Sequence, residues 1–229
     1  MTADSSSLAW IIYFIEEYGS LFLYGAGVTL LISLSGTVIG FVIGLIIGVI
    51  RTIPMDHNTG AITRVSYKLL NFLLLCYIEI FRGTPMMVQA MVVFYGAAIM
   101  FGIHMSALWA GIFIVSINTG AYMAEIIRAG IESVDKGQME AARSLGLTYG
   151  MGMRHIVLPQ AIKTMIPSII NQFIITLKDT SILSIIGFPE LTNVGKTIMG
   201  NTFKSLETWA IVGVMYLIVI VSLSKASKK

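Results

Sequence analysis

The sequence has few charged residues and almost no cysteine for its length. Of its 229 residues, 12% are charged and 56% are hydrophobic, whereas about a quarter of the residues of a soluble domain are charged. The single cysteine, Cys76, can form no disulfide within the chain, and the histidines, His57, His104 and His155, lie far apart. These shortages argue against a disulfide-stabilised domain and a metal centre, and a net charge of +3 is too small to indicate nucleic acid.

The hydrophobic residues form long continuous runs, which predict an all-α integral membrane protein. A helix needs about 20 apolar residues to cross the hydrocarbon, and the runs do not alternate as the strands of a membrane barrel do. We expect five crossings within one transmembrane domain, residues 1–229, and no cleaved signal peptide. The expected segments are 21–50, 61–102, 107–127, 156–186 and 209–223.

Two of these segments contain a feature that predicts local structure. In the first, Gly36, Gly40, Gly44 and Gly48 recur every four residues and therefore share one helix face. Small residues at this spacing predict close packing against another helix. The second segment, 61–102, is too long for one straight span, so we expect it to bend at Gly83 and Pro85 and to cross once.

The distribution of positive charge predicts the orientation in the membrane. No Lys or Arg precedes Arg51, whereas basic residues follow the first span, surround the central polar segment at 128–163 and end the chain at 225–229. Lys and Arg are enriched in cytoplasmic loops. The N-terminus is therefore expected outside and the C-terminus in the cytoplasm.

The central polar segment predicts a short amphipathic helix over 135–145. Met139, Ala142 and Leu145 share one face at three-residue spacing. We expect Gly146 and Gly150 to let the chain reverse and Pro159 to lie near the start of the next helix. Such a module suits a soluble partner that docks on it, and the alternative is a helix lying on the lipid surface.

A spacing pattern in this segment resembles a known family. Glu140-Ala141-Ala142, then Gly146, Ile156 and finally Leu158-Pro159 match the coupling loop of binding-protein-dependent ABC importer permeases without a mismatch. Three further runs resemble the polar amino-acid subgroup of that family, of the histidine, glutamine and arginine permease type. These runs are Phe81-Arg82-Gly83-Thr84-Pro85, Ala124-Glu125-Ile126-Ile127-Arg128-Ala129-Gly130-Ile131 and Leu177-Lys178-Asp179-Thr180-Ser181.

The resemblance implies a five-span type I permease fold in a bacterial inner membrane. It implies partners as well: a second permease subunit in a homodimer or heterodimer, cytoplasmic ATP-binding cassette ATPase subunits and an extracytoplasmic solute-binding protein. The coupling segment, about 132–159, would contact the ATPase. Its expected contact residues are Glu140, Ala141, Ala142, Gly146, Leu158 and Pro159. The chain ends soon after the last span, which puts in doubt any C-terminal helix that contacts the ATPase.

Polar residues at membrane depth are the candidates for the substrate path, because such groups usually face a cavity or a partner. Asn118 and Thr119 lie near the middle of one span. Asn171 and Gln172 lie in the next span, with Lys178 and Asp179 about two turns further along. Asp179 suits the ammonium group of an amino acid, and helix–helix hydrogen bonding is the alternative role. Glu125, a further candidate, lies three residues before Arg128, as Glu79 does before Arg82, and both spacings favour an intrahelical pair.

The sequence predicts a transport subunit that is not itself an enzyme and binds no cofactor. Gly195-Lys196-Thr197 resembles the end of a phosphate-binding loop, but Glu190 stands where the loop requires glycine. ATP and Mg²⁺ are therefore expected on the partner ATPase. The alternative function is an ion-coupled secondary amino-acid transporter, which would use intramembrane carboxylates. A channel would need a pore-lining ring, and an intramembrane enzyme would need a catalytic constellation that we do not find.

Overall fold

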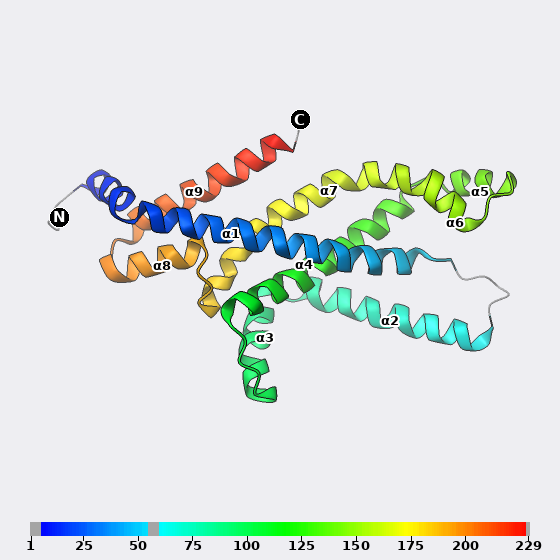
Figure 1. Ribbon diagram of the computed structural model, residues 1–229, viewed down its shortest axis with the longest axis horizontal. Helices are drawn as coiled ribbons and strands as arrows, with labels where there is room; N and C mark the ends of the chain where they lie inside the picture. Colours follow the sequence, from blue (N-terminus) through cyan, green and yellow to red (C-terminus); the bar gives the residue numbers. More distant parts are fainter. Residues whose placement is uncertain (1–5, 55–59, 228–229) are drawn as a thin grey trace. The chain divides into compact units, whose positions relative to one another are not determined.

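The computed structural model describes residues 6–54 and 60–227, and all regular structure within these ranges is helical. Residues 1–5, 55–59 and 228–229, which include His57, lie outside the described residues. Figure 1 shows the elements in chain order. They are α1 Ser7–Thr52, α2 Ala61–Gly83, α3 Met86–Phe101, α4 Ala107–Glu132, α5 Lys136–Ser144, α6 Tyr149–Gly152, a π-helical turn Met153–Val157, α7 Leu158–Asp179, a 3-10 helix Thr180–Ile186, α8 Leu191–Thr202 and α9 Ser205–Ala226.

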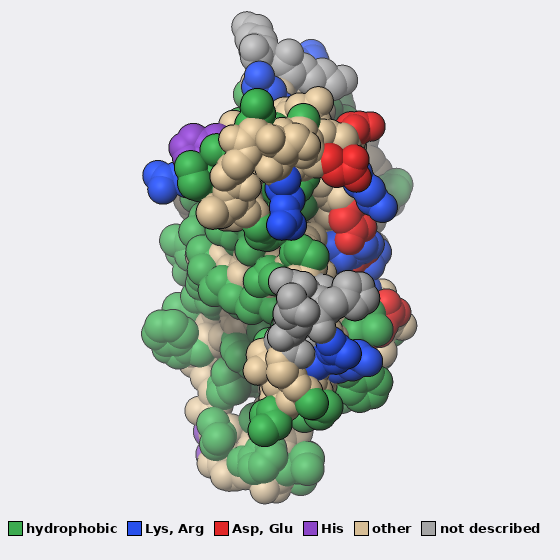
Figure 2. Space-filling view, turned by 90° about the vertical axis from the view of Figure 1, so that its right-hand side faces the viewer, with side chains coloured by type: hydrophobic (Ala, Val, Ile, Leu, Met, Phe, Trp, Pro, Cys, Tyr) green, Lys and Arg blue, Asp and Glu red, His purple; other side chains and the backbone are tan. Residues whose placement is uncertain are grey.

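Five helical stretches of the described chain are long and apolar enough to cross a membrane, which confirms the five-span prediction. These stretches are Ser7–Thr52, Ala61–Gly83, Ala107–Glu132, Tyr149–Ile186 and Ser205–Ala226. Many large hydrophobic side chains of these helices are exposed, as lipid contact requires. The face drawn in Figure 2 also contains charged side chains among the hydrophobic ones.

The bend predicted at Gly83 and Pro85 is present. Helix α2 ends at Gly83, and Thr84 adopts an extended conformation before Pro85, which is the conformation that a following proline favours. The next helix, α3, has 16 residues, fewer than a span needs. Segment 61–102 thus contains one span and one shorter apolar helix.

Helix α1 begins earlier than predicted, at Ser7 rather than near Leu21. It has 46 residues, so at 1.5 Å per residue it is about 70 Å long, roughly twice the hydrocarbon thickness. The added turns contain an aromatic cluster in which Trp10, Phe14 and Tyr18 make ring contacts. Phe14 is fully buried in a core shared with α8 and α9. The sequence predicts a later start because Glu16, Glu17 and Gly19 separate these aromatic residues from the apolar run that begins at Leu21.

The chain divides into two compact units, each with its own core. The first unit comprises residues 1–36, 86–115 and 173–229, and the second comprises 37–85 and 116–172. In the first unit, one core contains Phe188, Ile32 and Ile114, and another contains Phe14, Phe22 and Leu191.

A buried carboxylate holds α8 in place within the first unit. Glu190 is fully buried and caps the N-terminus of α8, where it accepts hydrogen bonds from the N–H groups of Thr192 at 2.8 Å and Asn193 at 2.7 Å. It also accepts one from the Tyr216 hydroxyl of α9 at 2.8 Å. Burial raises the pKa of Glu190, and these three donors oppose the rise. Helix α8 is therefore fixed at its start by both backbone and side-chain bonds.

In the second unit, the glycine face of α1 packs closely against α4, as the four-residue spacing predicted. A Cβ atom added at Gly40 would lie 2.9 Å from Thr119 Cβ and 3.0 Å from the Gly120 backbone nitrogen. One added at Gly48 would lie 2.8 Å from the Ala124 carbonyl oxygen. The helix backbones can approach this closely only because these side chains are absent. In the first unit, Gly36 packs in the same way against Val115.

We predict that Gly40→Ala destabilises the protein and that Gly27→Ala does not. The first change forces the α1 and α4 backbones apart, at a cost of about 1–3 kcal/mol for overpacking. The second adds a methyl group to the same helix at a position where no atom lies within 4 Å of it. Its only expected effect on stability is therefore the small gain from the higher helix propensity of alanine. Thermal unfolding of the purified protein in detergent compares the two. Equal melting temperatures for both variants would contradict the close packing.

Candidate functional site

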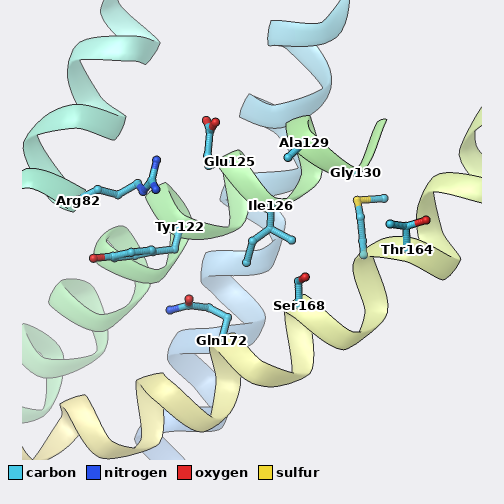
Figure 3. A pocket seen from close by; sticks show the side chains of 10 residues that line it. Arg82, Tyr122, Glu125, Ile126, Ala129, Gly130, Thr164, Ser168 and Gln172 are labelled. Carbon is cyan, nitrogen blue, oxygen red and sulfur yellow. The ribbon is translucent and has the colours of Figure 1, made fainter. Parts of the chain in front are cut away.

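A cavity of about 340 Å³ opens within the second unit. Its walls come from the end of α2, the second half of α4 and the first part of α7 (Figure 3). The lining residues are Arg82, Tyr122, Glu125, Ile126, Ala129, Gly130, Thr164, Met165, Ser168 and Gln172. A volume of this size lies within the range of small-molecule sites.

Arg82 supplies positive charge to this cavity. Its guanidinium carbon lies 5.5 Å from the ring centroid of Tyr122 on α4, in a cation–π contact. The predicted pair between Arg82 and Glu79 is wrong, because neither residue makes an ion pair with a described residue. The side chain instead reaches across to α4 (Figure 3). Arg82 therefore has a charge that a ligand can use.

Glu125 joins two helices through ion pairs. Its carboxylate accepts a hydrogen bond from Arg51 of α1 at 3.2 Å. It also pairs with Arg128, one turn further along α4, which confirms the predicted Glu125–Arg128 pair. Arg128 in turn contacts Glu132. Arg82 and Glu125 are the charged residues that line the cavity itself, and the carboxylate of Glu125 is bound by Arg51 and Arg128.

Helix α7 contributes a polar stripe to the opposite wall. Thr164, Ser168 and Gln172 recur every four residues and line the cavity from one helix face (Figure 3). Gln172 is only 6% exposed, although it can both donate and accept hydrogen bonds. The stripe offers hydroxyl and amide groups opposite the arginine.

The other predicted substrate residues do not line this cavity. Asn118 is buried in α4 and donates a hydrogen bond to the Phe81 carbonyl oxygen at 3.1 Å. Thr119 is buried beside Gly40, whereas Asn171 is exposed. Asp179 is half-buried at the end of α7, in the first unit. Of the predicted set, Glu125 and Gln172 contribute to the cavity wall.

The residues that sequence reasoning missed are Arg82, Tyr122, Thr164 and Ser168. Arg82 was assigned to Glu79 because a three-residue spacing on a helix favours a local pair. For Thr164 and Ser168, the available signal was the four-residue spacing that they share with Gln172. Tyr122 carries no sequence signal of its own, because its role depends on a contact between two helices.

The coupling segment, 132–159, contains the short helix predicted for it. Asp135 caps the N-terminus of α5 by accepting a hydrogen bond from the Gly137 N–H at 2.7 Å. On the inner face, Ala142 is 1% exposed and Met139 packs with a core that includes Ile131 and Val157. The outer residues, Glu140 and Ala141, are exposed.

The prediction that Leu145 shares the packed face of α5 is wrong. Leu145 is the C-cap, lies past the last helical turn and is 81% exposed. After it, Gly146 has a φ of 83°, and its N–H donates to the Arg143 carbonyl oxygen. The Leu147 N–H bonds to the Ala142 carbonyl oxygen, which completes a Schellman motif. Gly146 alone makes the reversal, since Gly150 lies within α6 and has no positive φ.

Pro159 is the second residue of α7, as predicted, but the helical path begins ten residues earlier at Tyr149. The π-helical turn Met153–Val157 joins α6 to α7, and the Leu158 N–H bonds to the Met153 carbonyl oxygen. Because proline has no N–H to donate, a wider turn just before it loses little hydrogen bonding.

Comparisons with known proteins identify the family that these features define. The chain is a helical membrane protein with a polar cavity and an exposed helix-turn module between its spans. Residues 59–227 match the family model described as "Binding-protein-dependent transport system inner membrane component". The chain belongs to this family, which confirms the resemblance found in the sequence.

Curated relatives include two amino-acid permeases. The chain is 38% identical over 205 residues to the glutamine transport system permease protein GlnP of Escherichia coli K12, covering 89% of this chain and 88% of the relative. It is 38% identical over 152 residues to the arginine transport system permease protein ArtQ of Bacillus subtilis, covering 66% and 69%.

Solved structures show the same fold. A crystal structure of an amino acid ABC transporter with histidines superposes with a TM-score of 0.85 at 36% identity, covering all of this chain and 97% of that one. The inward-facing MetNI methionine ABC transporter has a TM-score of 0.76 at 21% identity, covering 93% and 95%, and supports the fold alone.

We predict that Glu125→Gln destabilises the protein while Glu132→Gln has little effect. The neutral amide leaves Arg51 and Arg128 without their shared carboxylate in a largely buried position, at a cost of about 1–3 kcal/mol. Glu132 is 53% exposed in its side chain, and exposed pairs contribute little. Thermal unfolding in detergent is the measurement. The account of Glu125 fails if both variants melt at the wild-type temperature.

Proposed function

We propose that this chain is the permease subunit of an ATP-driven importer of a polar or charged amino acid. The observation that carries the proposal is the cavity in which Arg82 lies opposite the stripe Thr164, Ser168 and Gln172. The named relatives, a glutamine and an arginine permease, agree with this substrate class.

Each part of the cavity suits one part of an amino acid. A guanidinium group matches a carboxylate in charge and geometry, so Arg82 would bind the α-carboxylate. The hydroxyl and amide groups of α7 would bind a polar side chain. Glu125 is already compensated by two arginines and would position the wall of the cavity. The roles of Asn118, Thr119, Asn171 and Asp179 in the substrate path stay predictions, with Asp179 assigned to the ammonium group.

The exposed part of the coupling segment would receive the ATPase. Glu140, Ala141 and Leu145 are exposed. Exposure of a leucine side chain to water is unfavourable, so Leu145 suits a contact with a partner. The buried Ala142 and the partly buried Met139 hold α5 against Gly152, where an added Cβ would lie 2.8 Å from Met139 Sδ. A movement of the ATPase would therefore displace α5 and α6 together. Leu158 and Pro159 would carry it into α7, and ATP and Mg²⁺ would bind to the ATPase.

The complete transporter would contain further subunits. We assign to it a second permease, in a homodimer or a heterodimer, cytoplasmic ATP-binding cassette subunits and an extracytoplasmic solute-binding protein. The family description names the dependence on a binding protein. The chain would lie in the bacterial inner membrane with its N-terminus outside and its C-terminus in the cytoplasm, as the positive charges favour.

We predict that Gly146→Val uncouples transport and that Gly146→Asn retains most of it. A β-branched residue is strained at a φ of 83°, whereas asparagine is accepted at this position of a Schellman motif. No atom lies within 4 Å of the added Cβ, so space does not distinguish the variants. The measurement is amino-acid uptake per ATP hydrolysed in proteoliposomes, with the amount of co-purified ATPase as control. Wild-type uptake by Gly146→Val would contradict the role of the turn.

We also predict that Arg82→Gln raises the half-saturating amino-acid concentration at least tenfold. The change removes a charge-assisted hydrogen bond, and a tenfold loss corresponds to about 1.4 kcal/mol. Lys163→Gln removes one positive charge at an exposed position of α7 that does not line the cavity and should leave uptake unchanged. Uptake at several concentrations by the two reconstituted complexes is compared. Equal half-saturation in both would exclude Arg82 from the substrate site.

A further inference from the structure

Gln172 has an unpaired amide group in the wall of the cavity. The residue is only 6% exposed, and it lines the cavity with its amide pointing from α7 toward α4 (Figure 3). The side-chain amide makes no hydrogen bond with a described residue. A buried amide that lacks hydrogen bonds destabilises a folded protein. The packing of α7 alone therefore does not explain a glutamine at this position, whereas a ligand that bonds to it does.

The amide is the most versatile hydrogen-bonding group of this wall. It offers two N–H donors and a carbonyl acceptor, whereas a hydroxyl offers a single donor. The Thr164 hydroxyl already donates to the Gln160 carbonyl oxygen at 3.4 Å. Gln172 can therefore donate to a ligand and accept from it at the same time.

The cavity has no free carboxylate for a cationic side chain. Glu125 is the only carboxylate among the described residues that line it. One oxygen of Glu125 bonds to Arg128, and the other bonds to both Arg51 and Arg128 at 3.2 Å. A cation that enters would be buried without a partner, which is costly.

An anionic side chain is disfavoured for a related reason. Arg82 is the only cationic residue among the described residues that line the cavity, and the α-carboxylate of the amino acid would occupy it. A second carboxylate would find no second cation. The charges of the cavity therefore favour a side chain that is polar but uncharged.

We propose that Gln172 selects a substrate with a carboxamide side chain, as in glutamine, over glutamate and arginine. Two amides can donate to each other and accept from each other, whereas a carboxylate only accepts and a guanidinium only donates. This inference rests on the proposed function. It decides a point that similarity leaves open, because the glutamine permease and the arginine permease are both 38% identical to the chain.

Binding to the permease in the absence of the receptor tests this selection, because the receptor's own preference then plays no part. The probe is radiolabelled glutamine, added to the purified permease–ATPase complex in lipid nanodiscs and displaced by unlabelled glutamate or arginine. We expect the wild type to bind glutamine at least about tenfold more tightly than either competitor, since a site built for hydrogen bonds rejects a ligand that leaves them unmade.

Gln172→Leu removes the amide with little change in side-chain size. The dissociation constant of glutamine should rise at least about tenfold, and the preference over glutamate and arginine should disappear. The melting temperature should be equal or higher, because a buried unpaired amide is lost. Gln172→Glu should raise the affinity for arginine relative to glutamine at least about tenfold, since a carboxylate accepts from a guanidinium. Asn201→Leu replaces an exposed amide of α8 outside the cavity and should change nothing.

Each other result overturns the proposal. Equal affinity of the wild type for the three amino acids excludes the selection, and so does a failure to bind any of them. If Gln172→Leu keeps the preference, Gln172 does not set it. If that variant loses all three ligands equally and melts at a lower temperature, Gln172 is only structural. An equal loss in Asn201→Leu would make the effect unspecific. Failure of the proposed function is distinguishable, because the wild-type complex with receptor would then show no ATP-dependent uptake of any amino acid.

Discussion

The constraint on which the second unit depends is the need to neutralise charge inside a membrane-spanning bundle. Glu125 cannot remain unpaired at such a position, because an isolated carboxylate in a low-dielectric setting is very costly. Arg51 of α1 and Arg128 of α4 share it. This pairing joins the end of α1 to the middle of the cavity wall. Arg82, on a third helix, makes no ion pair with a described residue and lies against the ring of Tyr122 instead.

Close helix packing makes this charge arrangement possible. The glycine face of α1 lets the α4 backbone approach within contact distance at Gly40, Gly44 and Gly48. In lipid such contact stabilises a helix pair mainly through van der Waals packing, since burial of apolar groups brings no gain over lipid. A one-turn displacement of α1 would break both the glycine contact and the Arg51–Glu125 bond. The glycine contact and this ion pair therefore hold the same two helices together.

Features that appear as a residue spacing within one segment could be predicted from the sequence, whereas the particular side-chain partner on another helix could not. The five spans, the Gly83–Pro85 break, the glycine contact and the Glu125–Arg128 pair each follow from spacing along one segment. Leu145 was misplaced because the periodicity of α5 was extended one residue past the helix end that Gly146 sets. Arg82 was misassigned for a similar reason: a favourable local partner, Glu79, was visible in the sequence, whereas Tyr122 on another helix was not. Thr164 and Ser168 had a detectable stripe pattern, but α7 is amphipathic along its whole length, so the pattern alone does not identify a cavity.

The central claim is that ATP hydrolysis by a partner drives amino-acid movement through this chain. The measurement that tests it most directly is uptake of radiolabelled glutamine by proteoliposomes that contain the purified complex, with receptor outside and ATP inside. The account predicts uptake that requires ATP and is unaffected when proton and sodium gradients are dissipated. A secondary transporter is the rival function, and its uptake would be driven by an ion gradient rather than by ATP. Uptake without ATP, driven by an imposed ion gradient, would contradict the account.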